Sequence, residues 1–361
     1  MSTTDTTGEL ETKVTKDAFG TTPDGAPVEI YTLASAAISV RIMTLGARVV
    51  SILTPDKHGA MADVVLGAPT AAAYLQGKNA YFGAIVGRYG NRIAGGKFTI
   101  EDQPYQITLA KGMKNALHGG AVGFDWRVWT ARPLADGVEM TLVSPDGDQG
   151  FPGTLTAHVT YTLQGNALVL HFRSTTSKTT VVNLTSHSYF NLAGEGEGLI
   201  TDEIVTINAD HFVPTDAESI PTGEIAPVAG TPFDLRQPTR IGADIDAPNQ
   251  QLQFAGGYDH CWVLNGPVGE LKLAARVEDP RSGRVLTVTT TEPGVQFYTG
   301  NFLDGSRVGP SGRPYLRRSG LCLETQHLPD SPNHPNFPST ELRPGEERRS
   351  QTIFTFTTTQ P

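Results

Sequence analysis

The chain is built from short runs in which apolar and polar residues alternate, and turn residues separate one run from the next. Alternation with a period of two is typical of a β-strand with one buried face, and Gly, Pro, Asn and Asp between runs favour turns. A helix is favoured at residues 70–76 (TAAAYLQ), through the high helix propensity of alanine. The pattern predicts an all-β protein, arranged as a sandwich or a barrel-like stack. The expected strands cover residues 28–33, 37–43, 49–54, 64–66, 97–100, 105–109, 138–143, 155–163, 167–174, 204–209, 262–264, 271–277, 285–291 and 352–358.

Domain organisation follows from changes in composition. Residues 1–17 include seven Ser or Thr residues and almost no large apolar side chains, so we expect a loose, flexible N-terminal tail. Beyond this tail, no segment changes in composition as an interdomain linker does. We therefore expect residues 18–361 to form one domain.

Overall composition narrows the function. The formal net charge is −9, and the sequence shows no basic face of the kind that phosphate binding needs, which argues against nucleic-acid binding. No apolar run reaches the roughly 18 residues of a membrane span, and the N-terminal segment lacks the apolar centre of a signal peptide. Cys261 and Cys322 stand in apolar runs and suit a reduced compartment. We therefore expect a cytoplasmic protein with no nucleic-acid or membrane partner.

The stretch 321–339 (LCLETQHLPDSPNHPNFPS) is the most informative part of the chain. An apolar run at 321–323 predicts a buried strand, and Glu324 ends that run. Prolines at 329, 332, 335 and 338 exclude a helix interior or a central strand and predict an ordered loop that carries His327 and His334. Glu324 thus lies where a strand meets a loop, a common place for chemistry facing a cleft. The alternative is a strand-end acid that faces water.

Several other motifs carry polar side chains among glycines or aromatic residues. Two glycines after His118 allow the backbone to approach a ligand closely. His187 lies in a polar run and is either a proton donor and acceptor or a core histidine bonded to a carbonyl. Amides beside aromatic rings, such as Gln296 beside Phe297 and Tyr298, suit a sugar, which presents hydroxyls and apolar C–H faces. The candidates from these motifs are Arg88, Asn91, Arg92, His118, His187, Asp259, His260 and Gln296.

Other chemistries find less support. The histidines are scattered and form no H-E-x-x-H motif, so we expect no metal site. No G-x-S-x-G sequence indicates a serine hydrolase, and the glycines at 87–96 do not have dinucleotide-binding spacing. Glu324 and Asp259 could supply the two carboxylates of a glycosidase, and this alternative stays open.

Taken together, the motifs strongly resemble the aldose 1-epimerase (galactose mutarotase) family. The resemblance runs from about residue 20 to the C-terminus. Its motifs, in chain order, are GRYGNRI (87–93), NALHGG (115–120), GFDWRVW (123–129), GFPG (150–153), SHSYFNLAG (186–194), YDH (258–260), PGVQFYTGNFL (293–303) and ETQHLPDSPNHPNFPS (324–339).

The resemblance implies a large antiparallel β-sandwich, the galactose mutarotase-like supersandwich, with a monosaccharide on a concave face. It also implies interconversion of the α and β anomers of aldohexoses such as galactose and glucose, with no cofactor and no metal. By motif, Glu324 resembles the general base that takes the anomeric hydroxyl proton, and His187 resembles the general acid that protonates the ring oxygen. The residues that resemble the sugar-holding set are Asn91, Arg92, His118, Asp259 and Gln296.

Two departures from the family pattern and two alternatives remain. Cys261-Trp262 follows the YDH motif, where the family usually has a polar residue and a smaller aromatic. PGEERRS (344–350) carries arginines where an aromatic is usual, and we expect no catalytic consequence from this second departure.

An epimerase for phosphorylated hexoses would need a cationic clamp, which Arg88 and Arg92 could supply. A non-catalytic sugar-binding sandwich would not need both Glu324 and His187. The preferred sugar and the choice between monomer and homodimer stay open.

Overall fold

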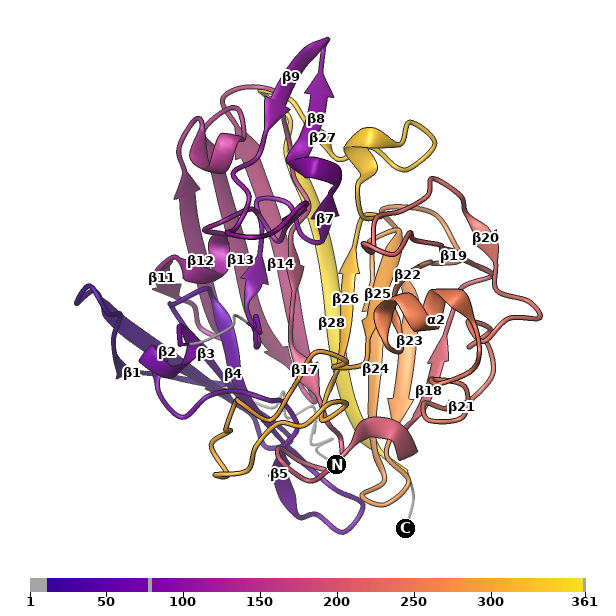
Figure 1. Ribbon diagram of the computed structural model, residues 1–361. Coiled ribbons are helices and arrows are strands. Elements are labelled where there is room, and N and C mark those ends of the chain that lie inside the picture. Colours follow the sequence, from indigo (N-terminus) through magenta and orange to yellow (C-terminus); the bar gives the residue numbers. More distant parts are fainter. Residues whose placement is uncertain (1–11, 77–79, 360–361) are drawn as a thin grey trace, which may run out of the picture.

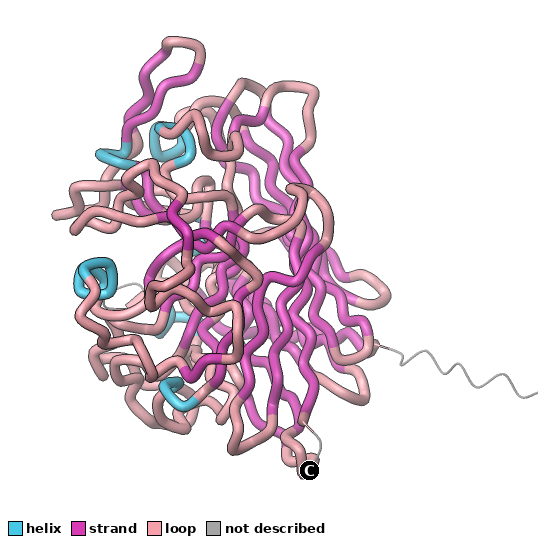
Figure 2. The backbone as a smooth tube through the Cα atoms, turned by 90° about the vertical axis from the view of Figure 1, so that its right-hand side faces the viewer, coloured by secondary structure: helices cyan, strands magenta, loops and turns pink. Residues whose placement is uncertain are grey.

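The computed structural model describes residues 12–76 and 80–359. Within these residues three larger sheets dominate, and all their strand pairs are antiparallel (Figure 1). This confirms the predicted all-β fold. In the same part of the chain, no helix has the length and apolar character needed to cross a membrane. Figure 2 shows that strands fill one side of the molecule, while loops and short helices gather on the other.

In the two largest sheets, the order of the strands in space differs from their order in the chain. From edge to edge, the nine-stranded sheet consists of β11 (Thr130–Pro133), β12 (Gly137–Ser144), β13 (Leu155–Gln164), β14 (Ala167–Thr176), β28 (Arg348–Thr358), β24 (Arg284–Thr290), β23 (Lys272–Glu278), β18 (Ile204–Ile207) and β21 (Thr239–Arg240). The six-stranded sheet consists of β17 (Tyr189–Phe190), β26 (Leu321–Gln326), β25 (Gly294–Tyr298), β22 (Asp259–Val263), β19 (His211–Val213) and β20 (Ala226–Pro227). The five-stranded sheet consists of β1 (Lys13–Thr21), β2 (Pro27–Ala34), β3 (Ser39–Met43), β4 (Arg48–Pro55) and β5 (Met61–Asp63).

Shorter elements connect these sheets. The two-stranded pairs in the described part of the chain are β6 (Ile85–Val86) with β16 (Thr185–Ser186), β7 (Arg92–Ile93) with β10 (Ala116–Leu117), β8 (Lys97–Ile100) with β9 (Gln103–Gln106) and β15 (Thr180–Val181) with β27 (Glu341–Leu342). The helices there are α1 (Ala71–Tyr74), α2 (Gln250–Ala255) and the single 3₁₀ turns η1 (Ala94–Gly96), η2 (Phe124–Trp126), η3 (Asp148–Gly150), η4 (Ile200–Asp202) and η5 (Ser331–Asn333).

The main core lies between the nine-stranded and six-stranded sheets. On β26, Leu321 and Leu323 belong to one buried cluster that also holds Phe354 of β28. On the same face of β26, the Thr325 hydroxyl lies 2.6 Å from the hydroxyl of Thr352 on β28. Burying one large apolar side chain contributes roughly 1.5–3 kcal/mol. The cluster takes side chains from all three larger sheets, and on that ground we propose that residues 18–361 form one domain, to which the first strand adds its residues from Lys13 onward.

The first strand begins inside the segment expected to be a tail. Residues 13–17 pair with β2, from Lys13 opposite Ala34 to Asp17 opposite Ile30. Val14 also packs against the core cluster. Backbone pairing therefore orders a polar segment whose composition alone favours disorder. The remainder of the expected tail, residues 1–11, lies outside the described residues.

Several short elements differ from the sequence predictions. The strand expected at residues 64–66 is only a single β-bridge, between Val65 and Phe190, and β5 ends just before it at Asp63. β9 begins at Gln103, whereas the predicted strand begins at residue 105. The strand includes Pro104, which lies opposite Thr99, because both strands of a two-stranded ribbon are edge strands and an edge strand tolerates proline. α1 covers only four residues of the predicted helix. α2 was not predicted, although the Asn249 side chain caps its start and Gly256, with φ 69°, ends it.

Candidate active site

A cavity of about 200 Å³ lies on the face of the six-stranded sheet that points away from the nine-stranded sheet. Loops cover this face, as Figure 2 shows. The sequence-predicted site residues that line the cavity are Asn91, Arg92, His118, His187, Asp259 and Glu324. The structure therefore brings together residues that are up to 233 positions apart in the chain.

Strand alternation explains how the sheet supplies its part of the site. On β26, Leu321 and Leu323 face the core, so Glu324 points to the opposite face and into the cavity. Asp259 begins β22 and lines the same cavity. Gln296 lies opposite Glu324 in the β25–β26 register. One face of three neighbouring strands thus carries three of the predicted polar side chains.

Gln296 has a different position from the other predicted residues. It is only 3% exposed and is not among the described residues that line the cavity. Its Nε2 donates a hydrogen bond of 2.8 Å to Oδ1 of Asp259. The other carboxylate oxygen of Asp259, Oδ2, lies 3.8 Å from the guanidinium of Arg92. Gln296 and Arg92 therefore fix Asp259 from two sides.

Two loops complete the cavity wall. The pairing of β7 with β10 brings Asn91 and His118 together, and the His118 N–H donates to the Asn91 carbonyl at 3.0 Å. The Asn91 N–H donates to Nδ1 of His118, also at 3.0 Å. Burial, with His187 and Arg92 adding to it, lowers the His118 pKa well below its usual value. His118 is therefore neutral, its proton lies on Nε2, and this nitrogen is a hydrogen-bond donor.

The position after His118 requires glycine, because a side chain there would clash with neighbouring backbone. Gly119 has φ +99°, and a Cβ there would lie 2.0 Å from the carbonyl oxygen of Gly87. No other residue fits without moving the backbone. The NALHGG sequence thus allows two loops to pass in contact behind the cavity.

His187 and Glu324 form a buried acid–base pair. Their side chains are 5% and 3% exposed, and Nε2 of His187 lies 3.6 Å from Oε1 of Glu324. Nδ1 of His187 lies 3.5 Å from the Cys322 sulfur, so Nε2 is the nitrogen available to the cavity. Oε2 of Glu324 has no partner among the described residues. Both groups are therefore open to a ligand with two polar atoms close together.

Burial shifts both groups toward their neutral forms. Desolvation and the nearby charge of Asp259 raise the Glu324 pKa well above its usual value, against an opposing effect of Arg92. Desolvation lowers the His187 pKa to about 3. Both shifts disfavour the charged forms, so burial favours a carboxyl group and a neutral imidazole over a carboxylate and an imidazolium.

Comparison with known proteins identifies the family that carries this arrangement. The sequence profile of the family described as aldose 1-epimerase matches residues 29–355. The chain belongs to the aldose 1-epimerase family. It is 49% identical to galactose mutarotase of Sus scrofa and 47% identical to that of Homo sapiens, each over 95% of this chain and 98% of the relative. It is 40% identical to aldose 1-epimerase of Escherichia coli (strain K12), over 92% of this chain and 96% of the relative.

Solved structures agree with this assignment. A galactose 1-epimerase from Lactobacillus acidophilus NCFM superposes with a TM-score of 0.83 at 27% identity, covering 96% of this chain and 99% of that one. A GalM/aldose epimerase homologue from C. elegans gives a TM-score of 0.80 at 26% identity, covering 97% of this chain and all of that one.

Among the residues that the structure describes, one group of possible metal ligands is found, and it lies in the cavity. Ligand atoms of His118, His187 and Glu324 lie within 4.8 Å of one another. A metal-bound histidine normally donates its second ring N–H to an acceptor. In His118 that nitrogen instead accepts from the Asn91 N–H, so the cavity-facing nitrogen bears the proton and has no free lone pair. The donor set does not fit a metal ion.

Arg88 does not belong to the site. Its side chain is buried and donates to the carbonyl oxygens of Pro152 and Gly153 at 2.8 and 2.9 Å. It also donates to the Ser144 hydroxyl at 2.7 Å. Arg88 is not among the described residues that line the cavity. The clamp considered for a phosphorylated substrate thus loses one of its two arginines, because Arg88 holds neighbouring loops together.

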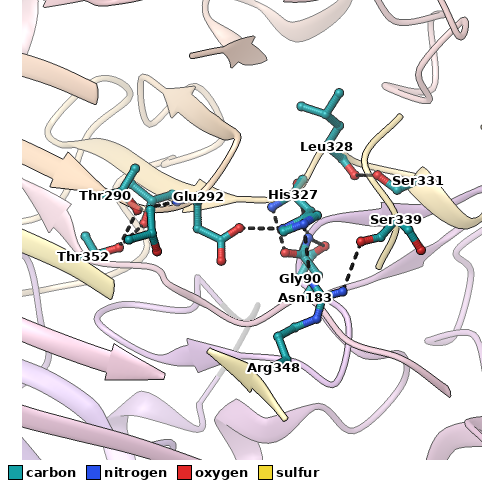
Figure 3. Close-up of polar contacts among 12 residues, drawn as sticks. Gly90, Asn183, Thr290, Glu292, His327, Leu328, Ser331, Ser339, Arg348 and Thr352 are labelled. Atoms are coloured by element: carbon teal, nitrogen blue, oxygen red, sulfur yellow. Dashed lines mark hydrogen bonds and ion pairs between the residues drawn. The ribbon is translucent and has the colours of Figure 1, made fainter. Parts of the chain in front are cut away.

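His327 also faces away from the cavity, into a second buried polar cluster (Figure 3). Its Nδ1 lies 2.6 Å from Oε2 of Glu292, and its Nε2 lies 3.3 Å from Nη1 of Arg348. Arginine can only donate, so Nε2 of His327 faces the donor of Arg348, and the proton on Nδ1 is directed at Glu292. We call these three residues the Glu292–His327–Arg348 cluster. His334, the other histidine of this loop, pairs with Asp330.

Asn183 connects this cluster to the site (Figure 3). Its side chain accepts from the His327 N–H at 3.0 Å and donates to the carbonyls of His327 and Gly90 at 3.3 and 3.2 Å. His327 lies three residues after Glu324, Asn183 four before His187, and Gly90 one before Asn91. One buried amide thus ties together the three segments that carry these site residues.

Sequence reasoning missed several residues of the cavity wall. Tyr81 and Tyr189 line it, and so does the loop that contains Asp304 and Arg307. Tyr189 lies inside the SHSYFNLAG motif, which was a usable signal. Tyr81 has φ 59°, outside any regular element, and no periodicity points to it.

Proposed function

We propose that the chain is an aldose 1-epimerase that interconverts the α and β anomers of free aldohexoses such as galactose and glucose. The observation that supports this most directly is the buried pair of His187 and Glu324, with 3.6 Å between Nε2 and Oε1. The anomeric hydroxyl and the ring oxygen are bonded to the same carbon. An acid and a base that act on both oxygens must therefore lie close together, as these two groups do.

Each proposed step is a proton transfer. Ionised Glu324 takes the proton of the anomeric hydroxyl, and protonated His187 delivers a proton to the ring oxygen, so the bond between C1 and the ring oxygen breaks. The product is an open-chain aldehyde with a new hydroxyl at the former ring oxygen. Rotation about C1–C2 exposes the other face of the carbonyl, and the same transfers in reverse close the ring. One acid and one base suffice, and no cofactor is required.

The remaining predicted residues would hold the sugar. His118 offers an Nε2 donor, Arg92 offers a cation, and Asn91 and Asp259 line the cavity beside them. Gln296 would act through Asp259, to which it donates. Charged groups fixed in this way form strong, directional hydrogen bonds with hydroxyls.

Location and assembly extend the proposal. Cys261 and Cys322 are buried and free, which suits a reducing compartment, and we place the enzyme in the cytoplasm on that ground. We expect it to act as a monomer or a homodimer.

Polarimetry of freshly dissolved α-D-glucose and α-D-galactose tests the proposal. The wild type should abolish the excess optical rotation much faster than buffer alone, whereas Glu324→Gln and His187→Asn should each lose roughly 100- to 10,000-fold in rate. Glu224→Gln and His58→Asn, both at exposed positions, are matched controls that should retain the wild-type rate. A wild type that accelerates mutarotation of no free aldose would overturn the proposal.

A stability measurement separates loss of chemistry from loss of folding. The raised pKa of Glu324 means that its ionisation is disfavoured in the folded protein. Replacing it by neutral glutamine removes that cost, so Glu324→Gln should unfold at or above the wild-type temperature at pH 7. An inactive variant with unchanged or higher stability would assign the loss to the missing base.

A further inference from the structure

Two tyrosine rings stack on the imidazole of His187. The Tyr81 ring centroid lies 5.5 Å from that of His187, with 24° between the planes. The Tyr189 ring centroid lies 5.1 Å away, with 23° between the planes. A cation within about 6 Å of an aromatic centroid is attracted by the negative face of the ring. Both tyrosines are within that distance of the position where protonated His187 would carry its charge.

A backbone hydrogen bond within His187 itself favours that charge, but the other groups around the ring add little to it. Cys322 contacts Nδ1, the His118 ring lies edge-on at 5.1 Å, and the charge of Arg48 opposes protonation. Among the described residues in direct contact with His187, Glu324 is the one group able to bring negative charge. Glu324 loses that charge when it takes a proton from the sugar. Ring faces provide an attraction that does not change with the protonation state of Glu324.

We infer that Tyr81 and Tyr189 stabilise the protonated form of His187 through their ring faces, and that Tyr81 is a positioning residue for the acid of the reaction. The inference rests on the proposed function, because it concerns how the acid of that reaction keeps its proton. The relevant part of tyrosine is the ring, not the hydroxyl.

The backbone holds Tyr81 against His187. The Gly83 N–H donates to the His187 carbonyl at 3.0 Å, and Arg48 donates to the Phe82 carbonyl at 2.8 Å. The Tyr81 ring also meets the edge of His118 at 4.6 Å, between the two histidines of the cavity. Its position is thus fixed by neighbours on both sides. A leucine or phenylalanine at this φ of 59° meets the same backbone demand as tyrosine, since neither is β-branched.

Tyr81 is the better of the two residues to change. Tyr189 is 4% exposed and packs edge-on against Phe82 and Tyr298, so its replacement would disturb the core. Tyr81 is half-buried at the cavity wall. The informative pair is Tyr81→Leu, which removes the ring, and Tyr81→Phe, which keeps it. Tyr105→Leu, which removes a ring stacked on Phe98 outside the site, is the matched control.

Steady-state kinetics of mutarotation should separate the variants. Tyr81→Leu should lower kcat about 5- to 30-fold, which corresponds to roughly 1–2 kcal/mol at 1.36 kcal/mol per tenfold, with KM within about twofold of wild type. Tyr81→Phe and Tyr105→Leu should keep kcat within about twofold. Binding of 1,5-anhydro-D-galactitol, which lacks the anomeric hydroxyl and cannot react, should be the same for wild type and Tyr81→Leu by calorimetry.

Each contrary result has a separate meaning. An unchanged kcat for Tyr81→Leu would overturn the inference while leaving the proposed function intact, provided that Glu324→Gln is inactive. A fall in kcat for Tyr81→Phe equal to that for Tyr81→Leu would assign the effect to the hydroxyl and also overturn it. A rise in KM and in the Kd for the anhydro sugar, at constant kcat, would make Tyr81 a sugar contact instead. An inactive wild type would refute the proposed function itself.

Discussion

Replacing Glu292 by glutamine removes one charge from the Glu292–His327–Arg348 cluster and changes little else. The side chains of Glu292 and His327 are only 7% and 11% exposed, so their hydrogen bond of 2.6 Å is scarcely screened by water. Glutamine has the same shape and can still accept from Nδ1 of His327, but it has no charge to pair with His327 or to attract the half-buried Arg348 cation on the other side of the imidazole. Breaking a buried ion pair in this way costs about 3–5 kcal/mol, and we expect the lower end, about 3 kcal/mol.

The expected shift in melting temperature follows from the size of the chain. At about 2.1 cal/mol/K per residue, unfolding 361 residues has an entropy of roughly 0.75 kcal/mol/K. A loss of 3 kcal/mol therefore lowers the midpoint by about 4 °C. Thermal unfolding followed by circular dichroism at pH 7 resolves a shift of this size.

The pH dependence gives a second test of the same reasoning. Burial alone would raise the Glu292 pKa, but attraction and a hydrogen bond from His327, with help from Arg348, lower it below its usual 4.5. A lowered pKa means that the carboxylate stabilises the fold above pH 4.5 and that this stabilisation is lost as the pH falls through the folded-state value. The gap between wild type and Glu292→Gln should therefore be full at pH 7 and shrink below pH 4.5.

A double-mutant cycle isolates the charge pair. Arg348→Met keeps the apolar stem and removes the cation, so the loss in the double variant should be smaller than the sum of the two single losses. The prediction is wrong if Glu292→Gln and the wild type have the same melting temperature at pH 7. It is also wrong if the difference in melting temperature is the same at pH 4 as at pH 7, because the effect would then come from packing.

Two further predictions concern other buried charges. The Glu203 pKa is raised to about 8, mainly by burial, so the folded protein loses stability as the pH rises from 4.5 to 8. Glu203→Gln should therefore melt at a higher temperature than the wild type at pH 8. A difference in melting temperature that is equally large at pH 5 would contradict this. Arg88→Met should lose about 3 kcal/mol or more, seen as a lower melting temperature, because it leaves the Pro152 and Gly153 carbonyls without a donor. A stable Arg88→Met variant with a selective loss of affinity for hexose phosphates would instead restore the phosphate clamp.

The sequence predicted the fold well where one face of a strand meets water. In β13 the residues alternate between buried and partly exposed positions along most of the strand, and the period of two is visible in the sequence. In β26 all six positions are buried, because the core covers one face and the cavity and its loops cover the other. There the pattern could not give the direction of Glu324. Only its polarity in an apolar run marked it as unusual.

The site was predictable through motifs and not through contacts. His118 and His187 were found because glycines or polar residues surround them in the sequence. Tyr81 was not found, since its place depends on bonds made by Gly83 and Arg48 to distant partners. Arg88 was considered as a ligand residue because a loop arginine that binds a ligand and one that binds distant carbonyls have the same local sequence.

The charges of the acid–base pair set the energetic course of the proposed reaction. Glu324 and His187 share one proton, present either as carboxylate and imidazolium or as carboxyl and neutral imidazole. Ring opening converts the first form into the second. Burial favours the second form, because it raises the Glu324 pKa and lowers that of His187, and each tenfold change in an acid dissociation constant amounts to about 1.36 kcal/mol. The cavity therefore stabilises the enzyme form that accompanies the open-chain aldehyde.

That preference would trap the open chain if nothing opposed it. Arg92 lowers the Glu324 pKa and so favours the carboxylate, while the stacked rings of Tyr81 and Tyr189 favour the imidazolium. A reversible catalyst works fastest when the states on its path are close in free energy, since a state that is too stable raises the next barrier. Arg92 on one side of the cavity, and Tyr81 and Tyr189 on the other, thus have the same effect on the acid–base pair. Arg92 offsets part of the free energy that burial costs the Glu324 carboxylate, and the tyrosine rings offset part of what it costs the His187 imidazolium.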